Sequence, residues 1–463
     1  MKTNTVIIGA GLTGLTTAYL LARKGCDAMV VEQMDTVGGQ IQTHEEGGFV
    51  FESGPNTGVM ANPEVAELMT DLELTSNGRC RLETAADTSK SRLIWKGNRF
   101  HRLPSGPVSA ATTPLFTFSD KLRILGEPWR SKGSDPDESA GSLARRRLGK
   151  SFVDYAVDPF LSGVYAGNPD SLITRYALPK LYNLEQDYGS FIRGAIAKAH
   201  QPKSGRERQA TKKVFSAVGG LSRIIESMTD YLGSRHIVLG AKNTKVMPSE
   251  DGWSVTYTNK EGEGKQVLCN KVVTTCGAYE LPKLLPFVCD EDMSQLNNLR
   301  YAPVVEISVG VNNTHGIDYQ AFGGLVPTCE RKKILGILFP SACFKGRAPE
   351  GGALFSYFIG GMRQAEFLGR SDAELAVLVE EYFHTMLGFP ATARPDLIRI
   401  FRHRLGIPQY EISTGERLAT IKRLQEQHPG LTIAGNLRDG IGMAHRIKQA
   451  TDIANQIITT IHG

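Results

Sequence analysis

The length, composition and charge of the chain exclude several classes of protein. Its 463 residues are too many for one compact core, so two or three domains are expected. Hydrophobic residues (41%) and charged residues (22%) are as frequent as in globular proteins. The net charge of +5 is spread along the chain, which argues against a nucleic-acid partner. No run approaches the roughly 20 apolar residues that span a bilayer.

The cysteines and histidines show no pattern typical of a metal site or of acid–base catalysis. Seven cysteines are scattered without a CxxC pair, which argues against zinc and against a disulfide framework. The ten histidines are isolated, and no Ser-His-Asp or Cys-His arrangement is evident. We therefore expect no metal and assign no catalytic side chain. The N-terminus is not a signal peptide, so we expect a cytoplasmic protein.

Two groups of basic residues have alternative interpretations. Arg145-Arg146-Arg147 is interpreted as a solvated helix face. A second group, between positions 203 and 213, is interpreted as a solvated loop. The alternative for that loop is contact with anionic lipid on the inner face of the cell membrane, or with an acidic substrate. Peripheral membrane contact and a homodimer both stay open. The loop residues are Lys203, Arg206, Arg208, Lys212 and Lys213.

The N-terminus predicts a strand–helix–strand unit that binds a dinucleotide. Thr5–Ile8 is a short apolar strand, Leu15–Lys24 has helical spacing, and Ala28–Glu32 forms a second strand. Between the first strand and the helix lies a GxGxxG loop. Its first glycine permits a tight turn, its second lets a pyrophosphate approach, and its third lets helix pack on strand. The loop residues are Gly9, Ala10, Gly11, Leu12, Thr13 and Gly14.

The residues after this loop favour FAD over NAD. Glu32, followed by Gln33, ends the second strand, where an acid accepts hydrogen bonds from ribose hydroxyls. Gly38-Gly39 and a later Gly54-Pro55 turn resemble FAD-binding oxidoreductases. Near the C-terminus, Ile433–Asn436 resembles the segment that meets the ribityl chain. The segment Gly440–Met443 opens a last helix, whose positive end would stabilise reduced flavin. No second GxGxxG follows a strand, so the substrate itself is expected to reduce the flavin.

The pattern of elements predicts an α/β protein built on a discontinuous Rossmann-type FAD-binding domain. Pro63–Leu74 is a predicted helix capped by Asn62, and Ser142–Leu161 is the clearest helix of an insert. A strand Leu431–Ala434 and a helix Met443–Ile461 close the chain. The expected domains are an FAD-binding domain (1–85, 215–300 and 405–463), a helical insert facing substrate or membrane (86–214), and a strand-rich substrate-binding domain (301–404).

Several later segments make the chain resemble the protoporphyrinogen oxidase family, FAD enzymes of haem biosynthesis. They are Arg146–Gly149, Gly163–Asn168, Phe322–Pro327, Leu335–Leu338 and Ile407–Tyr410. Besides Gly9–Gly14 and Glu32, the resemblance implies FAD contacts at Gly39, Gln40, Gly54, Pro55, Asn56, Thr57, Val246, Asn436, Ile441, Gly442 and Met443. It implies a substrate pocket at Gly167, Phe322, Gly323 and Leu325.

The resemblance implies the six-electron oxidation of protoporphyrinogen IX to protoporphyrin IX, with oxygen or a quinone as acceptor. The alternatives are oxidation of coproporphyrinogen III, an amine oxidase, a carotenoid-type desaturase, and a flavin-stabilised porphyrin carrier without activity. The chain departs from the family in one place. Pro107, not an arginine, follows Leu103–Gly106, which leaves Arg175 or Arg347 as candidate partners of a substrate propionate.

Overall fold

The computed structural model describes residues 1–462, and its core is a sheet of seven strands in the order β10-β2-β1-β13-β12-β11, with β19 also paired to β13. The strands β10, β2, β1, β13 and β19 run parallel, while β11, β12 and β13 form an antiparallel extension. The bounds are β1 Lys2–Ile8, β2 Ala28–Val31, β10 Ile237–Val238, β11 Lys242–Ser249, β12 Gly252–Thr258, β13 Gly264–Thr274 and β19 Leu431–Ile433.

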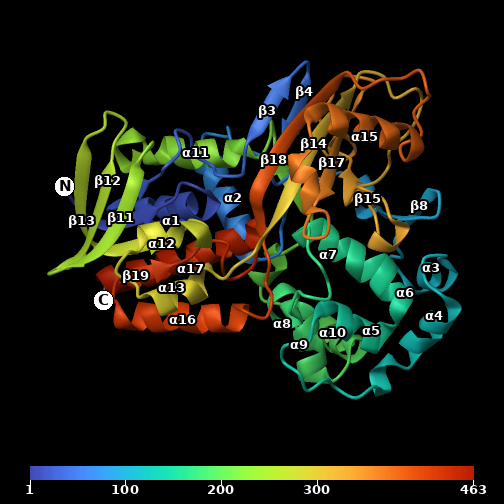
Figure 1. Cartoon of the computed structure of the whole chain (residues 1–463), viewed down its shortest axis with the longest axis horizontal. Coiled ribbons are helices and arrows are strands. Elements are labelled where there is room, and N and C mark those ends of the chain that lie inside the picture. Colours follow the sequence, from blue (N-terminus) through green and yellow to red (C-terminus); the bar gives the residue numbers. More distant parts are fainter. Residues whose placement is uncertain (463) are drawn as a thin grey trace.

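Helices cover both faces of this sheet (Figure 1). One apolar cluster joins the first strand to the helices α1, α2, α11 and α17, and a second cluster joins the other face to α12, α13 and α16. The N- and C-terminal segments meet here, because α1 packs along α17. The bounds are α1 Leu12–Arg23, α2 Pro63–Thr75, α11 Ser222–Leu232, α12 Leu281–Leu284, α13 Asp290–Asn297, α16 Thr414–Gln427 and α17 Met443–His462.

A second seven-stranded sheet has the order β18-β14-β17-β16-β15-β7-β8. Its apolar face packs on α15 (Asp372–Thr385), and the cluster between them contains Val305, Phe355 and Phe383. The bounds are β7 Arg92–Lys96, β8 Arg99–Arg102, β14 Tyr301–Val311, β15 Gly323–Leu325, β16 Gly336–Leu338, β17 Ala353–Gly360 and β18 Leu397–Pro408.

Short helices form a third region below the second sheet (Figure 1). They are α3 Pro107–Thr112, α4 Phe118–Leu125, α5 Ala140–Leu148, α6 Lys150–Phe152, α7 Asp158–Tyr165, α8 Thr174–Ala177, α9 Pro179–Tyr188 and α10 Phe191–His200, with a π-helical turn over Val153–Val157. Two smaller sheets connect the regions. They consist of β3 Thr43–Glu46 with β4 Phe49–Glu52, and of β5 Gly58–Val59, β6 Leu82–Thr84 and β9 Val214–Ala217.

The predicted fold class is confirmed, and so are the N-terminal strand–helix–strand unit and the capped helix. The Asn62 side chain accepts a hydrogen bond from the Val65 N–H, as expected of an N-cap. One prediction is wrong, because Ser142–Leu161 is not a single helix. Gly149 interrupts it with a φ of +97°, a conformation that ends α5, and the π-helical turn follows.

The range predicted as a helical insert also contains strands. β7 and β8 form a hairpin, and β7 pairs in parallel with β15, so this hairpin extends the second sheet. Sequence spacing does not reveal such a pairing, because β7 and β15 lie far apart in the chain. The domain limits given above therefore remain a proposal, with the hairpin assigned to the second sheet.

Candidate functional site

Each glycine of the GxGxxG loop has a different physical reason to be glycine. Gly9 has a φ of +107°, a conformation that L side chains rarely adopt. A Cβ at Gly14 would lie 1.9 Å from the Gly9 carbonyl oxygen, so only glycine lets α1 pack there. A Cβ at Gly11, by contrast, would meet nothing within 4 Å. The open space at Gly11 lies at the N-terminus of α1, where backbone N–H groups favour a phosphate. These features fit a dinucleotide pyrophosphate.

Glu32 follows β2 and lies against this loop. Its carboxylate is buried and accepts hydrogen bonds from the backbone N–H groups of Ala10 (2.7 Å) and Met34 (2.8 Å). The Gly38-Gly39 turn contacts the loop as well, because Gly38 forms a bridge with Gly11. The neighbouring Gln33 is exposed, and its carbonyl accepts from Lys242 Nζ at 2.6 Å. Residues from three separate turns are thus brought together around Gly11.

The Gly54–Thr57 turn joins the first region to the second sheet. A Cβ at Gly54 would lie 2.0 Å from the Gln40 carbonyl oxygen, so the close approach requires glycine. The Asn56 amide is buried, and its Nδ2 donates to Glu306 Oε1 of β14 at 2.6 Å, while its Oδ1 accepts from Ser356 Oγ of β17 at 2.7 Å. Asn56 therefore fixes the turn to two adjacent strands of that sheet, β14 and β17.

The Asn56 partner Glu306 is a buried acid. Burial raises the pKa of Glu306 well above its ordinary value, against the opposing effect of the Asn56 hydrogen bond. A second buried acid, Glu52, pairs with Arg347 at 3.0 Å, and burial also raises the pKa of Glu52. Burial therefore favours the neutral form of Glu306, which holds the turn without adding charge.

At the C-terminal end, Asn436 follows β19 and Met443 begins α17. The Asn436 side chain lies near Tyr301, whose hydroxyl is 3.5 Å from Asn436 Oδ1. Gly442 is exposed at the start of the helix, whereas Met443 is buried. Val246 lies within β11, and its side chain is part of the core cluster. The whole residue is 0% exposed, so its contact with the cofactor stays a prediction.

The segments expected to bind substrate lie beside α7. The Leu325 side chain lies so close to α7 that a Cβ at Gly163 would be 2.6 Å from it. Phe322 packs in a different apolar cluster, with Val214 and Phe344, and the Arg92 guanidinium lies 5.3 Å from its ring centre. A Cβ at Gly323 would lie 2.5 Å from the Ile337 carbonyl oxygen, so a substitution there tests strand pairing and not a pocket.

Gly167 lies at the end of α7, against Gln409. A Cβ at Gly167 would be 2.4 Å from Gln409 Oε1. The Gln409 Nε2 donates to the carbonyl oxygens of Tyr165 (2.8 Å) and Ile407 (2.9 Å). The two motifs 163–168 and 407–410 therefore form one contact, and Gly167 leaves room for the glutamine side chain.

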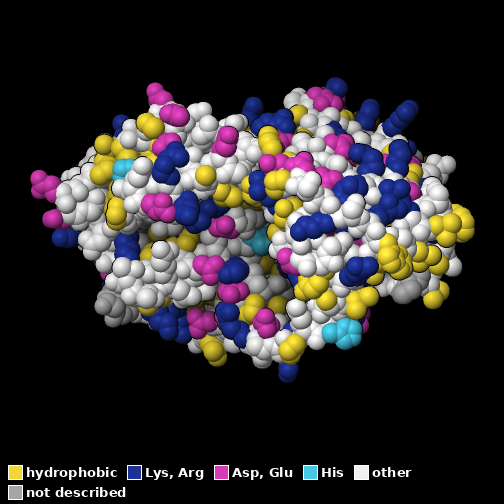
Figure 2. All heavy atoms as spheres, turned by 90° about the horizontal axis from the view of Figure 1, so that it is seen from below, with side chains coloured by type: hydrophobic (Ala, Val, Ile, Leu, Met, Phe, Trp, Pro, Cys, Tyr) yellow, Lys and Arg dark blue, Asp and Glu magenta, His cyan; other side chains and the backbone are white. Residues whose placement is uncertain are grey.

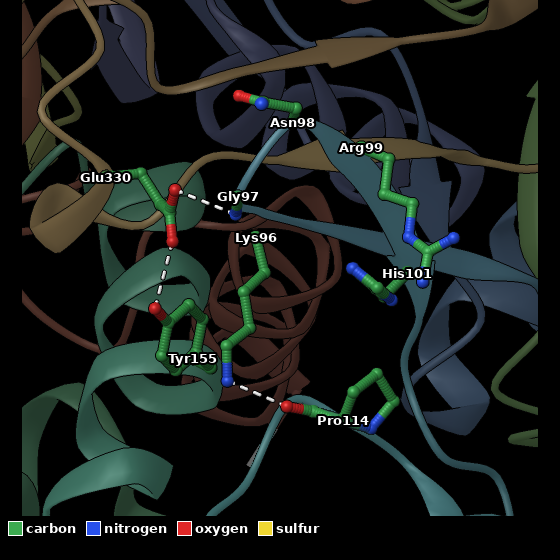
Figure 3. A pocket seen from close by; sticks show the side chains of 8 residues that line it. All are labelled: Lys96, Gly97, Asn98, Arg99, His101, Pro114, Tyr155 and Glu330. Atoms are coloured by element: carbon green, nitrogen blue, oxygen red, sulfur yellow. Dashed lines mark hydrogen bonds between the residues drawn. The ribbon is translucent and has the colours of Figure 1, made fainter.

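An open pocket of about 590 Å³ lies where the β7–β8 hairpin faces the π-helical turn (Figure 3). Glu330 accepts from the Tyr155 hydroxyl at 2.9 Å and from the Gly97 N–H at 3.0 Å. Lys96 Nζ lies 4.3 Å from the Tyr155 ring centre and donates to the Pro114 carbonyl at 2.7 Å. The sequence analysis missed these residues. The sequence feature that could have indicated this pocket is the run of basic residues around the turn Gly97-Asn98. The lining residues are Lys96, Gly97, Asn98, Arg99, His101, Pro114, Tyr155 and Glu330.

Three arginines differ from their predicted environments. Arg147 is fully buried, and pairs with Glu127 and Glu185 at 2.7 Å, so the interpretation of its helix face as solvated is wrong. Arg347 is buried against Glu52, and Arg175 pairs with Asp137 at 2.5 Å. Both candidate propionate partners are thus paired with carboxylates of the chain, Arg347 in the interior and Arg175 at a partly exposed position.

Comparison with known proteins identifies the family to which the chain belongs. The sequence profile of the family described as "Flavin containing amine oxidoreductase" matches residues 12–458. The chain belongs to this family. Protoporphyrinogen oxidase 2 of Arabidopsis thaliana is 29% identical over 99% of this chain and 94% of its own length. Protoporphyrinogen oxidase of Homo sapiens is 28% identical over 99% of both chains. The resemblance stated from the motifs is confirmed.

Solved structures of low sequence identity share the fold. A crystal structure from Exiguobacterium sp., of a protein provisionally named a protoporphyrinogen oxidase, has a TM-score of 0.80 at 22% identity, over 98% of both chains. Reduced UDP-galactopyranose mutase has a TM-score of 0.74 at 15% identity, over 99% of this chain and 96% of its own. The protein is an FAD-dependent oxidoreductase. The fold alone does not identify the substrate, since the same fold serves several reactions.

Residues 1–462 contain neither a cluster of potential metal ligands nor a helix able to span a membrane. No three His, Cys, Asp or Glu side chains converge there as they would around a metal ion. None of the helices formed by these residues combines the length and apolar character needed to cross a membrane.

Proposed function

We propose that the protein oxidises protoporphyrinogen IX to protoporphyrin IX. The observation that carries this proposal is the end-to-end match to protoporphyrinogen oxidases of plants and mammals, at 27–29% identity over at least 98% of this chain. The reaction removes six electrons and six protons from the macrocycle. When bound, FAD supplies the hydride acceptor. No second dinucleotide motif is evident, which favours oxygen or a quinone as the final acceptor.

The residues of the chain would contribute binding and alignment. Gly11 and the N-terminus of α1 would hold the pyrophosphate, and Glu32 the ribose. The apolar side chain of Leu325 beside α7 suits the pyrrole faces and vinyl groups of a porphyrinogen, whereas Phe322 packs in a separate cluster. Alignment of a ring carbon with the flavin needs no strong base, which agrees with a site built without a catalytic dyad or triad.

Coproporphyrinogen III is a second candidate substrate, and the hairpin pocket favours it. This substrate carries four propionates, two more than protoporphyrinogen IX. Lys96, Arg99 and His101 supply basic groups at one pocket, close to the strand that carries Leu325. A charge-assisted hydrogen bond to a propionate contributes about 1.5–3 kcal/mol, which is about ten- to a hundredfold in kcat/KM.

A side-by-side assay separates the two substrates. We expect a higher kcat/KM for protoporphyrinogen IX, and Lys96→Ala and Arg99→Ala should each raise the KM for coproporphyrinogen III roughly tenfold. Lys24→Ala, an exposed cation after α1, serves as the control. A preference for coproporphyrinogen III of more than about tenfold, weakening as salt is added, would replace protoporphyrinogen IX as the substrate. Replacing oxygen with a quinone in the same assay identifies the acceptor.

We also propose peripheral contact with a membrane, through the apolar surface of α3, α4 and the turn after α4. Five large hydrophobic side chains there are 52–79% exposed, and Figure 2 shows hydrophobic side chains gathered at that end of the molecule. An apolar patch on a short amphipathic helix is typical of interfacial binding. The side chains are Val108, Phe118, Leu122, Leu125 and Trp129.

Sedimentation with phospholipid vesicles tests this contact. The doubly substituted Phe118→Ser, Trp129→Ser variant should bind at least tenfold more weakly than the unsubstituted protein. Leu74→Ser removes a similarly exposed leucine at the end of α2 and should bind normally. Equal binding by all three proteins would contradict the proposed surface.

A further inference from the structure

The segment Gly435–Gly440 has an unusual backbone that needs support. It connects β19 to α17, and the φ angles of Gly435 (+97°), Asp439 (+64°) and Gly440 (+95°) are all positive. Glycine adopts positive φ readily and aspartate does so more often than most residues, so the segment is a tight turn whose shape depends on the side chains around it. The question is which side chains fix this segment, because Asn436 and Ile441–Met443 on either side of it are the residues expected to meet the flavin.

Tyr410 closes the segment with one hydroxyl group. This hydroxyl donates to the Asn436 carbonyl at 2.8 Å and accepts from the Gly440 N–H at 3.1 Å. The side chain is only 2% exposed, and burial raises the pKa of Tyr410 to about 12, so the hydroxyl keeps the proton that it donates. The Tyr410 hydroxyl oxygen thus links Asn436, near the start of the segment, to Gly440 at its end.

Arg446 and Arg417 hold the carbonyl groups between those ends. Arg446, in the first turn of α17, donates to the carbonyl oxygens of Gly435 and, at 2.7 Å, Arg438. Arg417 Nε, from α16, donates to the Leu437 carbonyl at 3.3 Å. Together with Tyr410, these side chains engage the carbonyl groups of four consecutive residues, 435–438.

The Arg446 charge is buried without a carboxylate partner. The residue is 7% exposed, and within residues 1–462 no carboxylate lies within 4.0 Å of its guanidinium. The nearby acid, Asp439, lies 3.5 Å from Arg438 and accepts from Gln449. The Arg446 Nε has no hydrogen-bond partner among the described residues. A positive charge beside the start of α17 therefore adds to the positive end of the helix dipole.

Tyr410 also connects this segment to the short-helix region. The Tyr410 carbonyl accepts from the Ile173 N–H at 2.9 Å, and the neighbouring Gln409 donates to Tyr165, as described above. A displacement of α7 and α8 would therefore move Tyr410, and with it the hydrogen bonds that Tyr410 makes to Gly435–Gly440.

We propose that Tyr410 and Arg446 are positioning residues for the flavin. Tyr410 fixes the backbone of Gly435–Gly440 in the shape that receives the cofactor, and the Arg446 charge favours the reduced form of the cofactor. This inference rests on the proposed placement of FAD against Asn436 and Ile441–Met443. It assigns to Tyr410 the coupling of the short-helix region to the cofactor site.

Four variants of the FAD-loaded protein test the inference. Tyr410→Phe removes one oxygen atom, and Arg446→Gln removes the charge. Arg446→Lys keeps the charge and serves as the rescue variant. Tyr165→Phe is the matched control, since its hydroxyl donates to the Ala177 carbonyl at 3.0 Å and not to Gly435–Gly440. The measurements are FAD content, the visible flavin spectrum and the midpoint potential. None of them requires a porphyrinogen, so they stand even if the proposed substrate is wrong.

We expect Arg446→Gln to shift the two-electron equilibrium about tenfold toward oxidised flavin, which is about 30 mV, and Arg446→Lys to restore it. Tyr410→Phe should alter the flavin spectrum, while Tyr165→Phe leaves spectrum and potential unchanged. Loss of FAD from Arg446→Gln but not from Arg446→Lys would also support the role of the charge. Wild-type spectrum and potential in both Tyr410→Phe and Arg446→Gln, or an equal change in Tyr165→Phe, would overturn the inference.

Discussion

At the scale of single residues, the proposed cofactor site depends on glycines, because a Cβ atom at several positions would collide with the backbone or with a bound ligand. Gly14 and Gly54 are glycines because a neighbouring backbone oxygen occupies the place of a Cβ. At Gly11 that place is open, so the chain folds with or without a side chain, and only a ligand would collide with it. Substitutions at these positions therefore separate folding from cofactor binding.

Gly11→Val should fold normally and lose its FAD. Gly11 has a φ of −77°, which valine can adopt, and the new methyl groups would enter the space where the pyrophosphate approaches. Flavin absorbance per protein and the circular dichroism spectrum measure the two effects. Gly264→Val, at the start of β13 and also without atoms near its Cβ position, should keep both normal. Full flavin occupancy in Gly11→Val would remove the loop from the cofactor site.

Glu306→Gln should stabilise the protein increasingly as the pH rises. Burial raises the pKa of Glu306 in the folded chain, whereas the unfolded chain ionises this residue above about pH 4.3, so ionisation of Glu306 costs stability as the pH rises above that value. Glutamine keeps the carbonyl oxygen that accepts from Asn56 and cannot ionise. The gain is about 1.4 kcal/mol for each unit by which the pKa is raised. Melting temperatures at pH 5 and pH 8 test this, and an equal difference at both values would contradict it.

At the scale of elements, the short-helix region is held by an ion network. Arg146 of α5 pairs with Glu138 and Glu185, and Arg147 pairs with Glu185 and Glu127. The Glu127 carboxylate also accepts hydrogen bonds from the first backbone N–H groups of α10. The Arg146–Gly149 motif is thus structural. It joins α5, α9 and α10, and Gly149 ends α5.

Arg147→Met should destabilise this region by about 3–5 kcal/mol, because it leaves buried carboxylates without their cation. Arg145→Met is a neighbouring control. Its guanidinium is half exposed and lies 3.4 Å from Asp170, so the expected loss is below about 1 kcal/mol. Urea unfolding followed by fluorescence of Trp129 and the other tryptophans measures both variants. Equal stability of the two proteins would show that the network does not hold the region together.

The sequence predicted what depends on neighbouring residues and missed what depends on distant ones. The glycine loop, the Asn62 cap and the strand before α17 are local patterns, and each was found. The burial of Arg147 depends on Glu127 and Glu185, which no spacing connects to it. The pairing of β7 with β15, and hence the hairpin pocket, likewise depends on a partner far along the chain.

At the scale of the whole molecule, the two large sheets meet where the proposed cofactor and substrate sites adjoin. Asn56 ties the cofactor-side turn to β14 and β17, and Gln409 and Tyr410 tie the short helices to the segment before α17. Seen from below, the surface is hollowed between the part with α16 and the part with α9 and α10 (Figure 2). Such an opening between two parts of a molecule suits a large, mostly apolar macrocycle.

Anaerobic mixing of the FAD-loaded protein with protoporphyrinogen IX tests the proposed function most directly. The proposal predicts that the flavin absorbance bleaches within the time of one turnover, and that oxygen or a quinone restores it while porphyrin fluorescence grows. The Gly11→Val protein, without flavin, should produce no porphyrin above the uncatalysed rate. A flavin that stays oxidised with both protoporphyrinogen IX and coproporphyrinogen III, but bleaches on adding a primary amine, would contradict the proposal and assign the protein to the amine oxidases.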